Sequence, residues 1–130
     1  MIRLIMNAKE EKIYKHAFDL KNDGKVGEAI AEFKQILERY PDSGISTSMI
    51  ASLYYSEIND PEKALPYAER AIELHPKSET ASFCLSLCLF DLNRKDDMNS
   101  EVERYVKEGG KIDLYNTLFE ENGLTIEDFT

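Results

Sequence analysis

Helix-stopping residues recur along this chain at a nearly constant spacing, and this repeat period constrains the fold more than any other feature. Pro41, Pro76 and Gly110 follow one another at nearly equal intervals of about 35 residues, a length typical of helical repeats. Between these residues the apolar side chains recur at spacings of three and four, which is the period of an amphipathic helix. Shorter turn signals divide each interval into two segments of helical length. The sequence therefore predicts an all-α chain built from pairs of helices.

Three successive units, beginning at Glu10, Ile45 and Glu79, carry side chains of the same kind at equivalent positions. The eighth position of each unit is small, which lets the two helices of a unit cross closely; it holds Ala17, Ser52 and Ser86. The predicted buried stripe of the second helices comprises Ala29, Phe33 and Ile36, then Ala64, Ala68 and Ala71, then Met98, Val102 and Tyr105. A period of this length is the signature of a helical solenoid.

The second helix of the middle unit is bracketed by prolines and contains another. Asp60 is placed to cap this helix, and Pro61 then occupies the first helical position, where its missing N–H costs nothing. Pro66 removes the amide that would bond the carbonyl oxygen of Glu62. We expect this defect on the solvent-facing side, where water can satisfy the carbonyl and the helix bends.

The pattern resembles the tetratricopeptide repeat family over about residues 10–112. The first two units have the small eighth residue, the alanine at position twenty, the apolar positions twenty-four and twenty-seven, and the proline at thirty-two. The third unit departs at Met98, Tyr105 and Gly110, and the aromatic usual at the fourth position is replaced throughout, by Ile13, Ser48 and Ser82. The resemblance implies one domain over residues 1–130, a right-handed superhelix with repeats at about 10–43, 45–78 and 79–112.

A further helix is predicted after the third unit, over about residues 112–122, followed by a tail at 123–130. Its apolar face would comprise Ile112, Tyr115, Leu118 and Phe119. Because a solenoid needs a terminal element to cover its last repeat, we expect this helix to act as a cap.

The resemblance places the fifth and ninth positions of the first helices in a concave groove. In this chain all six of these positions carry large apolar side chains, so we predict a peptide-binding groove. Its floor would comprise Tyr14, Phe18, Met49, Leu53, Phe83 and Leu87, with Phe90 at the twelfth position of the third unit. Its polar rim would comprise Glu11, Lys21, Asn22, Glu57 and Asp91.

An apolar floor of this size exceeds the few hundred Å² that monomeric proteins normally leave bare, so another polypeptide is expected to cover it. We predict a non-catalytic protein–protein interaction module, a scaffold or adaptor that binds a hydrophobic peptide or helix. One alternative is an assembly subunit whose groove is filled by a second copy or by its own termini, Ile2, Leu4, Ile5 and Met6 or Leu124, Ile126 and Phe129. A narrower version is a chaperone, since small acidic three-repeat chains resemble secretion chaperones.

Charge and motif content limit the other function classes. The formal net charge is −9, which disfavours nucleic acid and anionic membranes as partners. Cys84 and Cys88 share a helix face, but His16 and His75 stand in other units without metal-ligand spacing, so we predict packed thiols and no metal. With no catalytic triad and no phosphate-binding loop in the sequence, neither an enzyme nor a cofactor is expected.

The sequence also leads to an expectation about location. Two cysteines without a disulfide framework favour a reducing compartment. The opening residues have a shorter apolar stretch than a secretion signal requires, and no run approaches the roughly 18 apolar residues of a membrane span. We therefore predict a soluble cytoplasmic protein.

Overall fold

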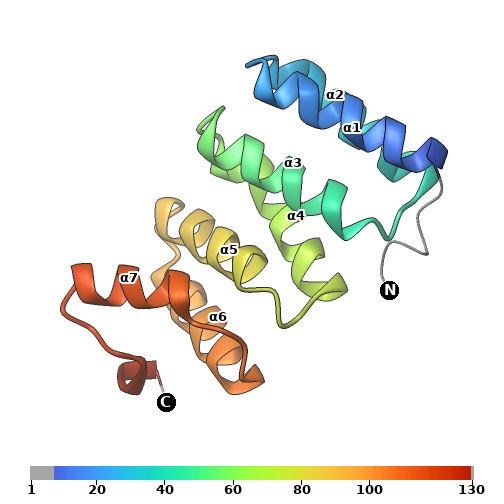
Figure 1. The fold of residues 1–130 in the computed structure, drawn as a ribbon. Coiled ribbons are helices and arrows are strands. Elements are labelled where there is room, and N and C mark those ends of the chain that lie inside the picture. The colour runs from blue at the N-terminus through green and yellow to red at the C-terminus, as the bar shows by residue number, and fades with distance from the viewer. Residues whose placement is uncertain (1–7, 130) are drawn as a thin grey trace.

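The computed structural model describes residues 8–129 and contains seven α-helices joined by short turns (Figure 1). The helices are α1 (Ala8–Asn22), α2 (Val26–Arg39), α3 (Gly44–Ser56), α4 (Pro61–Leu74), α5 (Glu79–Asp91), α6 (Lys95–Glu108) and α7 (Asp113–Glu121). A short 3-10 helix, η2 (Ile126–Phe129), ends the described part of the chain. Residues 8–129 contain no β-strand, and the predicted all-α, tetratricopeptide-like fold is confirmed.

Consecutive helices form pairs, and the pairs stack. Helix α1 packs on α2, α3 on α4 and α5 on α6, while α2 contacts α3 and α4 contacts α5. The first helices also meet directly, because α5 contacts both α3 and α7. In Figure 1 these three helices run in the same direction through the stack. The chain therefore builds one continuous series of layers.

The turn inside each pair repeats the same backbone conformation. Gly24, Asn59 and Asn93 occupy the fifteenth position of the three units and have φ values of 79°, 60° and 60°. Glycine reaches this left-handed region without steric cost, and asparagine tolerates it better than other residues with a side chain. The period of the sequence is thus visible in the backbone.

Side-chain caps fix where α3, α4 and α5 begin. The hydroxyl oxygen of Ser43 accepts the amide of Ser46 at the start of α3, and Ser78 accepts the amide of Ala81 at the start of α5. The carboxylate of Asp60 accepts the amide of Lys63 at the start of α4, which opens with a proline as predicted. Such caps contribute about 1 kcal/mol each.

The core follows the second helices. Eight of the nine residues in the predicted stripe are buried, and Met98 is half-buried. Among the small eighth-position residues, Ala17 and Ser86 are fully buried, whereas Ser52 is half-buried. The alanine stripe of α4 permits close approach of its neighbours.

Helix α7 continues the register of the units. Thr47, Ala81 and Tyr115 are separated by one repeat period each, occupy the same position in α3, α5 and α7, and are all buried. The same spacing relates three more buried residues: Ala51, Leu85 and Phe119. Helix α7 therefore stands where the first helix of a fourth pair would stand, and the chain continues into η2, which contacts α6.

Candidate protein-binding surface

The first two residues of the predicted groove floor lie on α1 and pack largely within the molecule. Tyr14 is only 9% exposed, and its hydroxyl is hydrogen-bonded to the hydroxyl of Ser43 in the next layer. Phe18 is half-buried, with its ring edge-on to the ring of Phe33 at a centroid distance of 5.4 Å. The Nζ atom of Lys21 lies 5.7 Å from the centroid of the Phe18 ring. This end of the predicted floor therefore presents little free apolar surface.

The middle of the predicted floor belongs to the same core. Leu53 is 4% exposed and Met49 is half-buried, and both pack in the cluster that contains Tyr14 and Phe18. The structure thus brings these four α1 and α3 residues together, with their side chains mostly directed into the interior.

The surface opens at the α5 end. Phe83 is half-buried and lies edge-on to Tyr115 of α7 at 5.4 Å, so α7 covers part of it. Leu87 is half-buried, and Phe90, nearly one turn further along α5, is 52% exposed. The Nζ atom of Lys95 lies 6.0 Å from the centroid of the Phe90 ring. Leu87 and Phe90 are therefore the accessible apolar side chains at this end of the predicted floor.

The predicted rim residues are polar and lie at or near the helix surfaces of α1, α3 and α5. Glu11, Asn22, Glu57 and Asp91 are exposed, and Lys21 is half-buried. The hydroxyl of Tyr55 donates a hydrogen bond to Asp91; burial, followed by this carboxylate, raises the pKa of Tyr55 well above its ordinary value. This contact joins α3 to the exposed end of α5.

Both cysteines are free thiols, and they interact with each other. Cys88 is buried and Cys84 is half-buried. The thiol of Cys88 donates to Cys84, which lowers the pKa of Cys84 and raises the pKa of Cys88. Within residues 8–129 no three His, Cys, Asp or Glu side chains are grouped so that they could hold a metal ion. The residues present therefore form a thiol pair in the core.

Comparison with known families identifies the chain. A family model described as YfiO, outer membrane lipoprotein, matches residues 6–107, which is more than half of the sequence. The chain belongs to the YfiO family. No curated protein matches it. The family contains repeats of the tetratricopeptide type, so membership agrees with the fold and supports a role in protein–protein interaction.

The predicted cytoplasmic location is wrong. The YfiO family is described as an outer membrane lipoprotein, which points to a membrane-associated location. The same description gives no support to the prediction that the chain has no membrane partner. The prediction rested on the cysteine count, the opening residues and the lack of a long apolar run, and none of these decides where a folded domain resides. None of the helices between residues 8 and 129 has the length and apolar character needed to span a membrane.

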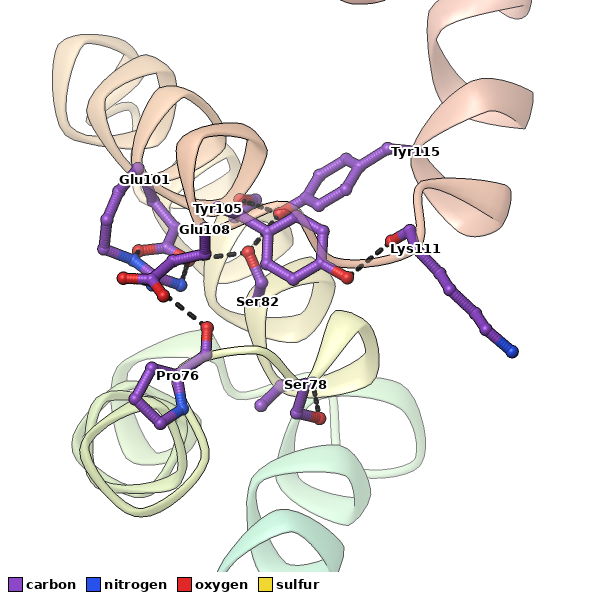
Figure 2. Close-up of polar contacts among 11 residues, drawn as sticks. Pro76, Ser78, Ser82, Glu101, Tyr105, Glu108, Lys111 and Tyr115 are labelled. Atoms are coloured by element: carbon purple, nitrogen blue, oxygen red, sulfur yellow. Dashed lines mark hydrogen bonds and ion pairs between the residues drawn. The ribbon is translucent and has the colours of Figure 1, made fainter.

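The sequence did not reveal the polar network that holds the end of this YfiO-family chain together (Figure 2). The hydroxyl of Ser82 donates to the carboxylate of Glu101 at 2.6 Å, and the hydroxyls of Ser82 and Ser86 each lie 2.7 Å from the hydroxyl of Tyr115. Arg104 donates two hydrogen bonds to Glu101, at 2.7 and 2.8 Å. The one signal for it was a serine, Ser82, at the fourth position where an aromatic residue is usual.

A carboxylate from α5 also caps α7. The Oε2 atom of Glu79 accepts the amides of Leu114 and Tyr115, at 2.9 and 3.3 Å. The residue before the helix, Ile112, provides no side-chain cap. The negative charge of Glu79 therefore satisfies amides at the positive end of the α7 dipole and fixes where α7 begins on α5.

Arginines at one repeat position tie the second and third helical pairs to the turn that precedes each pair. Arg70 donates to Asp42 at 2.9 Å. Arg104, one repeat period later, donates at 3.0 Å to the carbonyl oxygen of Pro76, which is labelled in Figure 2. Both contacts link a second helix to the turn that precedes its own first helix. In the YfiO-family fold of this chain they help to fix the spacing between layers.

Proposed function

We propose that this chain binds a hydrophobic peptide or helix of a partner protein on its concave surface, without catalysis, and that its three helical pairs are tetratricopeptide repeats. The observation that carries the proposal is the half-exposed ring of Phe90 beside the half-buried Leu87 on one face of α5. Aromatic side chains that are exposed on a rigid helix are common anchors in protein interfaces.

Three other floor residues are already held in place by packing against the core. Phe18, Met49 and Phe83 are half-buried, so their rings and thioether are already ordered by packing. A partner would bury only their remaining exposed edges, at about 25 cal/mol per Å² of gross apolar burial. Because little side-chain entropy is lost at pre-ordered groups, more of this burial contributes to affinity. The exposed carboxylates of Glu57 and Asp91 would favour a partner with nearby basic residues.

The absence of catalysis is part of the proposal. The hydroxyls of Ser82 and Ser86 are engaged with Tyr115, and the two thiols are engaged with each other. These groups are therefore occupied in structural contacts. No cofactor or metal is assigned to the chain.

Family membership directs the choice of partner. Because the YfiO family is described as an outer membrane lipoprotein, we place the interaction at the outer membrane and expect a protein resident there. This location replaces the cytoplasmic setting in which a secretion-type chaperone was considered.

A second candidate is an assembly subunit that fills its own groove, and one contact favours it. Tyr115 of α7 packs on Phe83, so part of the floor is covered by the chain itself. Ile126 joins the apolar cluster of α6 and α7, and Leu124 is partly exposed. The N-terminal candidates Ile2, Leu4, Ile5 and Met6, and the side chain of Phe129, lie outside the described residues. Pairing of two copies through Phe90 is the other form of this candidate.

Replacement of Phe90 tests the proposal without disturbing the core. The full chain, its Phe90→Glu variant and a charge-matched Ala31→Glu control on exposed α2 surface would be used to capture proteins from solubilised outer membranes. We expect the same partner with wild type and Ala31→Glu, and at least about tenfold less with Phe90→Glu. Equal recovery by all three folded proteins would contradict the proposal. Sedimentation showing a dimer that only Phe90→Glu dissociates would favour self-assembly.

A further inference from the structure

Helix α7 repeats the face of α5 that carries Leu87, one repeat period further along the chain. Leu114 follows Thr80 by one repeat period, and Leu118 follows Cys84 by the same interval. The matching burial of Tyr115 and Ala81 shows that this spacing is also the spatial register of α7 on α5. Leu114 is 41% exposed and Leu118, one turn later on the same face, is half-buried. Helix α7 thus presents two leucines on the face that corresponds to the Thr80, Cys84 and Leu87 face of α5.

This leucine face lies in the most acidic part of the molecule. From residue 109 onward the chain has one cation, Lys111, and five carboxylates: Asp113, Glu120, Glu121, Glu127 and Asp128. Glu121 follows Leu87 by one repeat period and lies two helical turns after Leu114, so it follows the two leucines along the same helix face. Asp113, Glu120 and Glu121 are all exposed. Apolar anchors and negative charge are therefore combined on one short helix.

The charge decides which occupant fits. A second copy of the chain docked through its own α7 would bring Asp113, Glu120 and Glu121 near the same three carboxylates of the first copy, and this repulsion opposes pairing. A wholly apolar segment would partly desolvate Asp113, Glu120 and Glu121 and would bring no positive charge to compensate for it. A segment with leucine-like anchors and neighbouring Lys or Arg side chains satisfies both features.

We infer that α7 extends the concave surface by one helix and binds a basic, amphipathic segment of a partner protein. This inference rests on the proposed function for the remainder of the groove, and it adds the charge that the partner carries and the end at which it binds. The surface lies beyond residue 107, where the match to the YfiO family ends.

The attachment of α7 suits it to this role. Glu79 caps its first turn, and the buried hydroxyl of Tyr115 fixes it against Ser82 and Ser86. Leu114 and Glu121 are consequently presented by a helix whose position is set by other groups, among them Leu118, which packs against the core cluster of α6 and α7. Substitution of Leu114 or Glu121 at the exposed face therefore leaves these attachments in place.

Model peptides test the inference on the full chain. The probe is a fluorescently labelled amphipathic helix of leucine and lysine, and the matched control peptide has glutamate in place of every lysine. We expect the lysine peptide to bind wild type and the glutamate peptide to bind at least about tenfold more weakly. Leu114→Ser and Glu121→Lys should each raise the Kd of the lysine peptide about tenfold. Glu69→Lys, the same charge change at an exposed position of α4, should change it by less than about twofold.

A Phe90→Ser variant separates the two proposals. If the α7 variants bind the lysine peptide within about twofold of wild type while Phe90→Ser weakens binding, the role of α7 is overturned and the groove stands. If the α7 variants weaken binding and Phe90→Ser does not, the Phe90 groove fails and α7 is an independent site. Equal binding of both peptides to wild type would also overturn the inference. Circular dichroism of each variant verifies that the helices are retained.

Discussion

The phenolic oxygen of Tyr115 lies 2.7 Å from the hydroxyl oxygen of Ser82. Since Ser82 donates its proton to Glu101, Tyr115 must donate to Ser82, and Ser86 then donates to Tyr115. The series of donors ends on a carboxylate that Arg104 neutralises. Each bond polarises the next in a buried setting, which strengthens the set as a whole. One tyrosine of α7 thus joins α5 and α6 at the end of the stack.

Removing this hydroxyl should destabilise the fold. Tyr115→Phe leaves the ring in place but deprives buried Ser82 and Ser86 of a partner, at a cost of about 1–3 kcal/mol in the free energy of unfolding. Urea denaturation measures the change. Because Ser86 is hydrogen-bonded to this same hydroxyl, the double variant Tyr115→Phe, Ser86→Ala should lose less stability than the sum of the losses in the two single variants. Strict additivity would show that the hydroxyls do not act together.

The same tyrosine makes stability depend on alkaline pH. Burial raises the pKa of Tyr115 to about 12, whereas the phenol has its ordinary pKa of about 10 in the unfolded chain. The folded state therefore holds the proton more tightly, so this contribution is intact below pH 10 and decreases as the pH rises toward 12. The loss should reach about 2–3 kcal/mol. The free energy of unfolding, measured from pH 8 upward, should fall less steeply for Tyr115→Phe than for wild type. Parallel curves would contradict the assignment of this pH dependence to Tyr115.

The turn between α6 and α7 requires glycine at position 110. A Cβ atom there would lie 2.7 Å from Cζ of the buried Tyr105, whose hydroxyl donates to the carbonyl of Lys111 (Figure 2). Gly110→Ala should therefore lower the free energy of unfolding by about 1–3 kcal/mol. Gly27→Ala is the matched control, because its Cβ would meet no atom within 4 Å, and it should be neutral or stabilising by up to about 1 kcal/mol. Similar effects of both changes on thermal unfolding would refute the steric account.

Pro66 weakens α4 at an exposed position. Alanine there restores the amide that can bond the carbonyl of Glu62, and it should raise the free energy of unfolding by about 1–3 kcal/mol. Pro61→Ala is the control, because proline is well tolerated at the first helical position. This substitution should change the free energy of unfolding by no more than about 1 kcal/mol. A loss of stability in Pro66→Ala would mean that the proline itself contributes to the packing of α4.

The sequence predicted those parts of the fold that depend on local chemistry. The caps at Asp60 and Pro61 and the alanine stripe of α4 can be inferred from residues close together in the chain. The hydrogen-bond network of Tyr115 could not be inferred in this way, because Ser82 and Tyr115 lie 33 residues apart and neither is unusual among its neighbours in the sequence. In the sequence, Ser82 at the fourth position is only a departure from the repeat pattern. Its role becomes clear when the fold brings Tyr115 into contact with it.

The predicted groove positions show the same limit. Their register follows from the period, but their exposure depends on the neighbouring layers. Tyr14 is enclosed by its contact with Ser43, and α7 covers part of Phe83, whereas Phe90 stays open at the end of α5. The membrane-associated location of the family was likewise beyond reach, because the residues that build the fold do not encode it.

Crosslinking from position 90 tests the central claim most directly. A photoreactive phenylalanine analogue in place of Phe90 keeps an aromatic ring at the open end of α5, and the same analogue at Ala31 reports on the exposed surface of α2. On illumination of intact cells, we predict a discrete adduct with another protein from position 90 and none from position 31. Equal labelling from both positions, or an adduct from position 31 alone, would contradict binding at the concave surface.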